Sequence, residues 1–197
     1  MASQGDPPKR VLPPGDLEAP VGRSVEELAV QLGEERVVGI CAELLAGGDR
    51  DAYLEVLPHL TGLSFDQGAP TRDRTVWKDY WVRTWGARGL LYVWRETASR
   101  AIVEGLADAH WRPAEMCLKV ATKREIGEAG PGAALLVQHP LPRVRSQAVR
   151  ALGAVGDTEH IEILRGRLED NHPGVRRQAG RAIERLAERL DLTQEAR

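Results

Sequence analysis

The stretch His139-Pro-Leu-Pro-Arg-Val-Arg-Ser-Gln-Ala-Val-Arg-Ala-Leu-Gly-Ala-Val-Gly-Asp157 decides the fold, because its pattern returns in the next segment of the chain. The related segment is Asn171-His-Pro-Gly-Val-Arg-Arg-Gln-Ala-Gly-Arg-Ala-Ile183. In both, a proline stands where a helix can begin. Valine and alanine then follow at spacings of three to four residues, which is typical of one buried helix face. Two helices in the same register are therefore predicted, and Val144 and Val175 are expected to face the core.

The step between these segments is 31 residues, and the same step relates positions from residue 82 to residue 183. Five series keep it: Val82, Pro113, Val144 and Val175; Arg88, Lys119, Arg150 and Arg181; Leu90, Ala121, Leu152 and Ile183; Ile102, Ala133 and Leu164; Leu106, Val137 and Leu168. A period between 20 and 50 residues is typical of stacked repeats. We therefore predict an all-α solenoid built from helical hairpins of about 31 residues, without strands.

The two quoted segments resemble the HEAT repeat of the short, phycobilisome-lyase-like type, and the similarity extends over about residues 77–190. The resemblance implies a scaffold of helix pairs, each sheltering the apolar face of the next. It also implies that the arginine following the repeated valine is tied to an acid or carbonyl in the next repeat. Arg83, Arg145 and Arg176 occupy that position.

Prolines, glycines and capping residues indicate where the segments of the chain begin and end. Residues 1–23 contain five prolines and are expected to be mobile or draped over the surface. Residues 24–61 are predicted to form irregular N-terminal helices, opened by a capping box at Ser24, with a helix over 34–46 and another starting at Asp49 or Asp51. Residues 62–75 form a loop, and residues 76–197 form the repeat array. Its first helices are predicted at 76–95, 111–127, 142–155 and 173–190, and its second helices at 97–107, 130–138 and 158–169.

Composition limits the class of protein. The apolar fraction is 42%, and no apolar run approaches the roughly 20 residues that a membrane-spanning helix requires. Cys41 and Cys117 stand singly in apolar stretches and are interpreted as core residues in a reducing, cytoplasmic setting. No spacing of His, Cys or acidic residues matches a metal motif, so neither metal nor cofactor is expected.

Charge is unevenly spread along the chain. Residues 1–70 carry five Lys/Arg against twelve Asp/Glu, and residues 71–197 carry 22 against 17. The acidic front and the basic repeats can attract each other or present two faces to different partners.

An aromatic and basic segment over residues 77–95 is the first candidate surface. On a helical wheel, Trp81, Arg88, Tyr92 and Arg95 lie away from the core side of Val82, and Trp77 joins them if the helix starts early. Such a face can stack bases or bind a protein partner. The simpler interpretation is that the N-terminal helices cover these rings as the first layer of the stack.

The row formed by Arg88, Lys119, Arg150 and Arg181 is the second candidate. These residues point away from the core, and stacked repeats would align them into a stripe able to neutralise phosphates. An ordinary solvated face, diluted by nearby acids, is the simpler interpretation.

A catalytic hypothesis rests on Asp79. Its position between Trp77 and Trp81, followed by Arg83, is similar to a local arrangement in HEAT-like alkylpurine DNA glycosylases. The resemblance implies a carboxylate that stabilises the cation formed as a glycosidic bond breaks. The simpler interpretation is that Asp79 complements the dipole at a helix start.

The preferred function at this stage is a non-enzymatic adaptor that binds another macromolecule, with a protein as the favoured partner. The second helices of HEAT-type stacks generally line the concave side, which makes Glu104, His160, Glu162, Arg165 and Arg167 candidate contacts. The alternative is a DNA- or RNA-binding protein that uses the basic rows and tryptophans. No membrane partner is expected.

Overall fold

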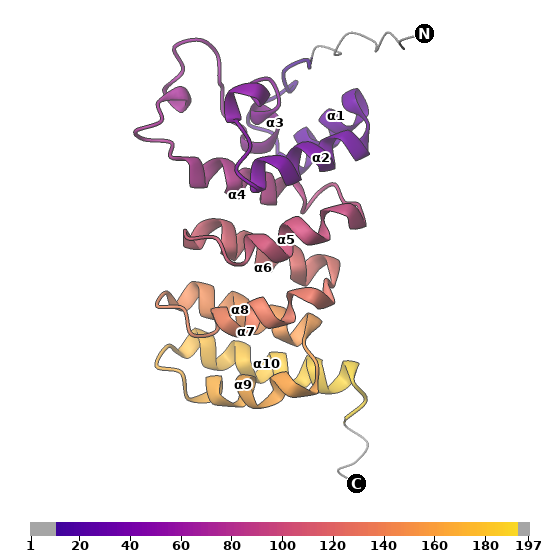
Figure 1. Cartoon of the computed structure of the whole chain (residues 1–197), viewed down its shortest axis with the longest axis vertical. Coiled ribbons are helices and arrows are strands. Elements are labelled where there is room, and N and C mark those ends of the chain that lie inside the picture. Colours follow the sequence, from indigo (N-terminus) through magenta and orange to yellow (C-terminus); the bar gives the residue numbers. More distant parts are fainter. Residues whose placement is uncertain (1–10, 193–197) are drawn as a thin grey trace. The chain divides into compact units, whose positions relative to one another are not determined.

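A computed structural model describes residues 11–192, and every regular element in that range is helical. The chain divides at Ala98/Ser99 into two compact units (Figure 1). The N-terminal unit contains α1 (Val21–Leu32), α2 (Glu34–Leu45), α3 (Leu57–Thr61) and α4 (Asp79–Gly89), with short 3-10 helices at Arg50–Tyr53, Pro70–Arg72 and Glu96–Ala98. The C-terminal unit contains α5 (Ser99–Gly105), α6 (Trp111–Arg124), α7 (Gly130–Leu136), α8 (Pro142–Val155), α9 (Ile161–Gly166) and α10 (Pro173–Arg189), with 3-10 helices at Gly127–Ala129, Thr158–His160 and Arg167–Glu169.

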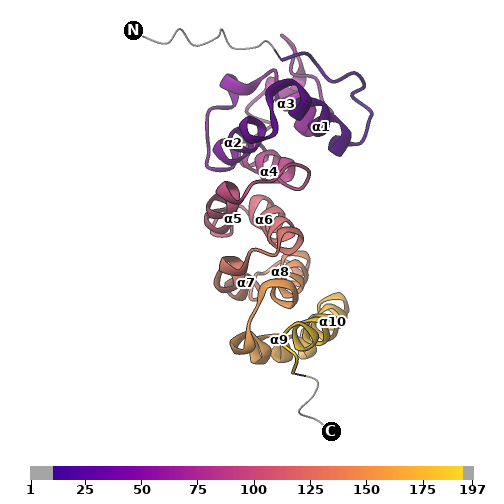
Figure 2. The same cartoon turned by 90° about the vertical axis from the view of Figure 1, so that its right-hand side faces the viewer.

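Helix pairs repeat in the C-terminal unit. Helix α5 packs on α6, α7 on α8 and α9 on α10, while α8 packs on both α6 and α10. Figure 2 shows the result as two rows, with α6, α8 and α10 on one side and α5, α7 and α9 on the other. Val144 and Val175 are fully buried, as the 31-residue register predicts. The all-helical fold with packed helix pairs is thereby confirmed.

The first helices of the repeats, α6, α8 and α10, each begin at a proline or at a capped turn. Pro142 and Pro173 occupy the first turn of α8 and α10, where a missing N–H costs nothing. The Nδ1 atoms of His110 and His172 accept hydrogen bonds from the backbone N–H groups of Arg112 and Gly174. Helix α8 spans the predicted residues, and α10 ends one residue before its predicted end.

The second helices are shorter than predicted. The segment predicted as one helix over 158–169 consists of a 3-10 turn, the six-residue α9 and another 3-10 turn. Asp157 and His160 form a capping box at its start: the Asp157 carboxylate accepts from Thr158 N, and His160 Nδ1 accepts from Asp157 N. Tight 3-10 turns at both ends shorten the helix while keeping Leu164 in the core.

The N-terminal unit departs from the expectations more often. Helix α1 begins at Val21, directly after Pro20, so the predicted capping box at Ser24 is wrong and Ser24 lies buried inside the helix. The helix expected from Asp49 onward is a 3-10 turn capped by the Asp49 side chain, and α3 begins only at Leu57.

Two further segments of this unit bear on the predicted boundaries. The first helix predicted for the array, over 76–95, is the shorter α4, which packs against α2 and α3. Of the segment 1–23, residues 1–10 lie outside the described part. Within 11–20, Leu12 is tied down: its N–H donates to Gln31 Oε1 at 2.8 Å, and its carbonyl oxygen lies 2.9 Å from His59 Nε2.

Glycines allow helices to approach closely in both units. A Cβ atom on Gly86 of α4 would lie 2.5 Å from the Cys41 carbonyl oxygen of α2. A Cβ atom on Gly153 of α8 would lie 2.8 Å from Ala182 Cα of α10. Both distances are shorter than carbon contacts in a packed interior allow, so only glycine fits.

Candidate binding surfaces

The tryptophans of the predicted aromatic surface pack on one another. The ring centroid of Trp77 lies 5.6 Å from that of Trp81 and 5.5 Å from that of Trp85, and Trp81 and Trp85 are stacked at 6.3 Å. Phe65 closes the cluster edge-on to Trp85 at 5.7 Å. Trp85 is buried, whereas Trp77 and Trp81 are half-buried. Much of the ring surface of this cluster is therefore in contact with other rings.

The other members of that predicted surface are held in separate contacts. The Tyr92 ring is exposed on one side and lies so close to Gly22 of α1 that a Cβ there would approach it to 2.8 Å. Arg95 binds Glu34 of α2 at 2.7 Å, and Arg88 on α4 is half-buried. The N-terminal helices thus cover part of this segment, in keeping with the simpler interpretation.

Asp79 opens α4 with its side chain exposed, 3.8 Å from the Arg74 guanidinium. It borders a cavity of about 320 Å³ whose lining is Gly47, Gly48, Asp49, Arg50, Arg74, Asp79, Val82 and Arg83. That lining contains charged residues, two glycines and Val82 but no aromatic ring, whereas enzymes that act on an extruded base hold it between aromatic or apolar side chains on both of its faces. The cavity lacks that feature, and the Trp77 and Trp81 rings are engaged in the aromatic cluster.

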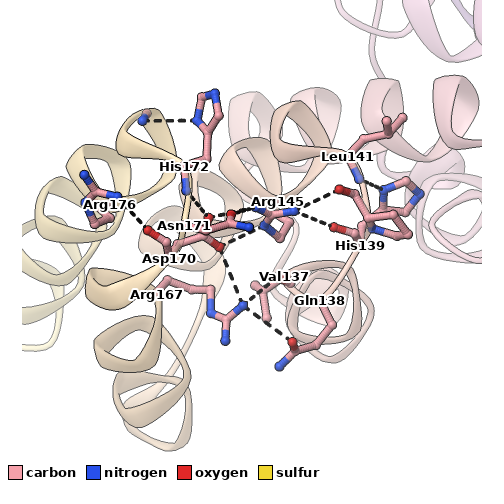
Figure 3. A network of polar contacts seen from close by, with 12 residues as sticks. Val137, Gln138, His139, Leu141, Arg145, Arg167, Asp170, Asn171, His172 and Arg176 are labelled. Carbon is pink, nitrogen blue, oxygen red and sulfur yellow. Dashed lines mark hydrogen bonds and ion pairs between the residues drawn. The ribbon is translucent and has the colours of Figure 1, made fainter.

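A buried ion pair between Arg145 and Asp170 connects two turns of the C-terminal unit (Figure 3). Arg145 of α8 donates from Nη2 to Asp170 Oδ1 at 2.7 Å and from Nε to Asp170 Oδ2 at 2.8 Å, a two-pronged geometry that guanidinium and carboxylate favour. The Asp170 side chain is 3% exposed. The hydrogen bonds from Arg145 hold the pKa of Asp170 below its usual range, and the same pair raises the pKa of Arg145.

The same two side chains also organise the backbone around them. Arg145 Nη1 donates to the carbonyls of His139 and Pro140 at 3.1 and 3.0 Å. Asp170 accepts from His172 N at 2.9 Å, and its carbonyl accepts from Arg176 Nη1 at 2.8 Å (Figure 3). The turn before α8 is thereby joined to the turn before α10. The predicted tie of Arg145 to an acid of the next repeat is confirmed.

Three members of the predicted basic row belong to the C-terminal unit, one on each first helix. Lys119 binds Glu115 at 3.1 Å, and Arg150 Nη2 donates to Gln178 Oε1 at 3.4 Å. Arg181 is exposed and makes no ion pair within residues 11–192. Arg88, the fourth member, lies on α4 of the other unit.

The contacts expected on the second helices are largely occupied by local partners. Glu104 binds Arg100 at 2.7 Å and Glu162 binds Arg165 at 2.5 Å, while Arg167 lies 3.7 Å from Asp170 and donates to the Val137 carbonyl. The prediction that His160 is a surface contact is wrong. Its residue is only 5% exposed, and its ring takes part in the capping box with Asp157.

Two clusters of interacting side chains in the structure were not predicted from the sequence. Arg50 is 3% exposed and donates from Nη1 to the Trp77 carbonyl at 2.9 Å and from Nη2 to the Arg72 carbonyl at 2.8 Å. Nothing periodic marks those partners, because they are backbone atoms of a loop.

The second missed cluster surrounds Trp111, whose ring has Arg112 at 4.4 Å and Arg143 at 4.7 Å from its centroid. Such guanidinium–ring contacts are favourable. A usable signal did exist here, since Arg112 and Arg143 are 31 residues apart.

The described residues offer no reactive or metal-binding cluster. No group of three or more His, Cys, Asp or Glu side chains in residues 11–192 could hold a metal ion. Burial raises the pKa of the Cys41 thiol to about 12 and that of Cys117 even further, so neither forms a thiolate near neutral pH. In the same range of the chain, no helix has the length and apolar character needed to cross a membrane.

Comparison with known proteins agrees with this geometry for the C-terminal part. Residues 132–194 match the family model of HEAT repeats. The chain matches no curated protein and no solved structure. Residues 132–194, which contain most of α7 and all of α8 to α10 within the described range, are therefore similar to HEAT repeats in sequence and in fold.

Proposed function

We propose that this protein is a non-catalytic scaffold of the cytoplasm that binds another protein through the surface of its C-terminal unit. The observation that carries the proposal is the coincidence of the HEAT match with the stacked helix pairs of α7 to α10. HEAT repeats generally serve as interaction scaffolds. The two free, buried cysteines suit a reducing compartment.

The way the unit uses its buried polar groups supports this proposal. Arg145, Asp170 and His160 are each engaged in hydrogen bonds that fix turns of the backbone. Polar groups that hold the backbone rigid leave two long helix faces in fixed positions. A rigid surface loses little conformational entropy on binding, which favours recognition of a partner.

Cross-linking in the native cell, followed by mapping of the linked residues, tests the proposal. We expect cross-links to one protein partner that fall within residues 99–192. An Arg145→Leu variant, which removes the lock between the turns, should lose them, and an Arg50→Met variant of the other unit should keep them. Cross-links that persist in Arg145→Leu, or that fall only within residues 11–98, would contradict the proposed role of the C-terminal unit.

Binding of DNA or RNA is the second candidate, and the exposed Arg150 and Arg181, which form no ion pair within residues 11–192, favour it. It predicts retention on heparin or DNA that falls steeply with salt and is lost in Arg150→Glu, with Trp81→Ala testing the aromatic cluster. If retention is seen, an assay of base release with Asp79→Asn as control decides whether chemistry follows. Absence of retention at low salt removes this candidate.

A further inference from the structure

The two rows of helices in the C-terminal unit differ sharply in charge. Helices α6, α8 and α10 together carry twelve Lys/Arg and three Asp/Glu. The second-helix segments, α5, Gly127–Leu136 and Thr158–Glu169, carry three Lys/Arg and five Asp/Glu. The protein as a whole has a net charge of −2, so the excess of positive charge is a local property of one row.

Part of this positive charge is neutralised within the unit. Glu115 of α6 is buried and binds both Lys119 at 3.1 Å and Arg143 at 2.8 Å. Arg185, near the end of α10, binds Glu125 at 3.2 Å. These pairs neutralise one cation on each of the three helices: Lys119, Arg143 and Arg185.

Three arginines of the row lie outside these ion pairs. Arg150 on α8 and Arg177 and Arg181 on α10 are exposed, and none of the three forms an ion pair within the described residues. The acids of α10, Glu184 and Glu188, both lie in its C-terminal half. We call the three arginines the α8–α10 basic face.

Packing brings the three guanidinium groups onto one surface. Gly153 and Ala182 let α8 and α10 approach until a Cβ on Gly153 would meet Ala182 Cα at 2.8 Å. Arg150 reaches across this contact and donates to Gln178, which lies between Arg177 and Arg181 in the sequence. Arg177 and Arg181 are four residues apart and so share one side of α10.

We propose that the α8–α10 basic face docks an acidic segment of the partner protein, with side-chain carboxylates of Asp and Glu paired to Arg150, Arg177 and Arg181. This inference rests on the proposed scaffold function and names the surface and the partner's chemistry. Guanidinium groups bind carboxylates through two parallel hydrogen bonds, which orients the bound segment as well as attracting it.

Carboxylates fit this face better than phosphates for two reasons. Helices α8 and α10 contain no aromatic residue, so the face lacks the rings on which bases of a single strand stack. The chain also has a net negative charge, with a sequence pI near 6.2, whereas nucleic-acid-binding domains are usually strongly basic.

The length of α10 sets the size of the docked segment. Its 17 residues span about 25 Å. An extended peptide of about eight residues covers the same distance. Because all three arginines are exposed, the interaction is expected to be weak at physiological salt and to strengthen as salt is lowered.

The test is fluorescence anisotropy of the full chain with a labelled peptide of about eight alternating Glu and Asp residues. Its comparison probes are the Gln/Asn version of that peptide and a single-stranded oligothymidylate of equal charge. We expect the acidic peptide to bind at low salt and more tightly than either comparison probe. The double variant Arg150→Glu/Arg181→Glu should weaken binding of the acidic peptide about tenfold or more.

The matched control is Arg100→Glu/Arg165→Glu, which makes the same change in charge on the second-helix side, where each arginine already has a local acid. It should leave binding within about twofold of wild type, and circular dichroism should show both double variants folded. Equal loss in the control variant would overturn the assignment to this face. Tighter binding of the oligothymidylate would overturn the choice of a protein partner.

Failure of this inference is distinguishable from failure of the proposed function. If the acidic peptide does not bind, yet the cross-links to residues 99–192 persist in Arg150→Glu/Arg181→Glu, the scaffold function stands and the basic face is excluded as its docking site. Loss of the cross-links in that variant but not in Arg100→Glu/Arg165→Glu supports both.

Discussion

Within residues 11–192, each compact unit contains one buried arginine, and the two arginines are held in different ways. Arg145 of the C-terminal unit is neutralised by the carboxylate of Asp170. Arg50 of the N-terminal unit donates to the carbonyls of Arg72 and Trp77, and its nearest carboxylate, Asp51, lies 4.0 Å away. The first joins two copies of a repeat, whereas the second clamps a loop that occurs once.

This difference explains why one unit is regular and the other is not. In a repeat array each unit contacts its neighbour through equivalent positions, so a side chain at such a position can reach the turn of the next repeat. A loop without a period needs its own anchor, and backbone carbonyls supply acceptors wherever the loop passes. The comparison predicts that disrupting Arg145 and disrupting Arg50 will have effects of different size and extent.

The largest effect is expected from Arg145→Leu. This change leaves the Asp170 carboxylate buried without its cation, which costs about 3–5 kcal/mol of unfolding free energy. Hydrogen exchange of the full chain should show lost protection in peptides covering α8 and α10, with peptides from residues 21–89 unchanged. The double variant Arg145→Leu/Asp170→Leu is the control and should recover most of the loss, because no buried charge remains. Unchanged protection in the single variant would refute the role given to the pair.

The repeat unit illustrates what the sequence could predict. The 31-residue register placed Val144 and Val175 in the core, because a buried helix face constrains residue type at every turn. The breaking residues on either side, Pro142 and Gly156, gave the bounds of α8. The tie of Arg145 to an acid was implied by the HEAT resemblance. Its partner Asp170 was not identified, because the equivalent position one repeat earlier is His139, although Asp108 stands in the same register two repeats earlier.

Three other features of the structure could not be predicted correctly from patterns in the sequence. The start of α1 was misplaced because Ser-x-x-Glu at Ser24 has the form of a capping box, although the helix already begins three residues earlier, at Val21, directly after Pro20. His160 was predicted as a surface contact because it lies on a second helix, whereas its capping role depends on the turn at Asp157. Arg50 depends on loop carbonyls, whose positions follow only from tertiary structure.

The second effect in size concerns the glycines at the helix contacts. Gly86→Ala would place a Cβ 2.5 Å from the Cys41 carbonyl oxygen and 2.7 Å from Leu45 N, both backbone atoms that cannot turn aside. We expect a loss of about 3 kcal/mol, the upper end for overpacking. Gly153→Ala meets backbone of Ala182 at 2.8 Å and should cost somewhat less. Urea unfolding of each variant measures the loss.

Matched glycine controls exist in the same helices or their neighbours. A Cβ on Gly39 of α2 or on Gly180 of α10 meets nothing within 4 Å. Alanine at either position should raise the unfolding free energy by up to about 1 kcal/mol through helix propensity. If Gly86→Ala proved as stable as Gly39→Ala, the close approach of α2 and α4 would be wrong.

A smaller loss is expected from Arg50→Met. The change leaves the carbonyls of Arg72 and Trp77 without donors. We expect the unfolding free energy to fall by about 2 kcal/mol, because the groups left unpaired are neutral acceptors and not a charge. Exchange protection should fall in peptides covering residues 62–78, while α8 and α10 keep theirs. The exposed Arg36 of α2 provides the control, since Arg36→Met should change little. An effect as large as that of Arg145→Leu would remove the distinction between the two anchors.

The smallest effect is the pH dependence of the Arg145–Asp170 pair. The hydrogen bonds from Arg145 keep the pKa of Asp170 below its usual value. The unfolded chain has that carboxyl near pKa ~3.9, so the stabilisation is fully present above that pH and is lost as pH falls through the lower folded value. The difference in unfolding free energy between wild type and Asp170→Asn should therefore be constant from about pH 7 to pH 5 and shrink below about pH 4. Urea titrations of both proteins across this range measure it. Because the variant shares every other carboxyl with wild type, a difference that stayed constant at low pH would mean that Asp170 is not stabilised as the anion of the pair.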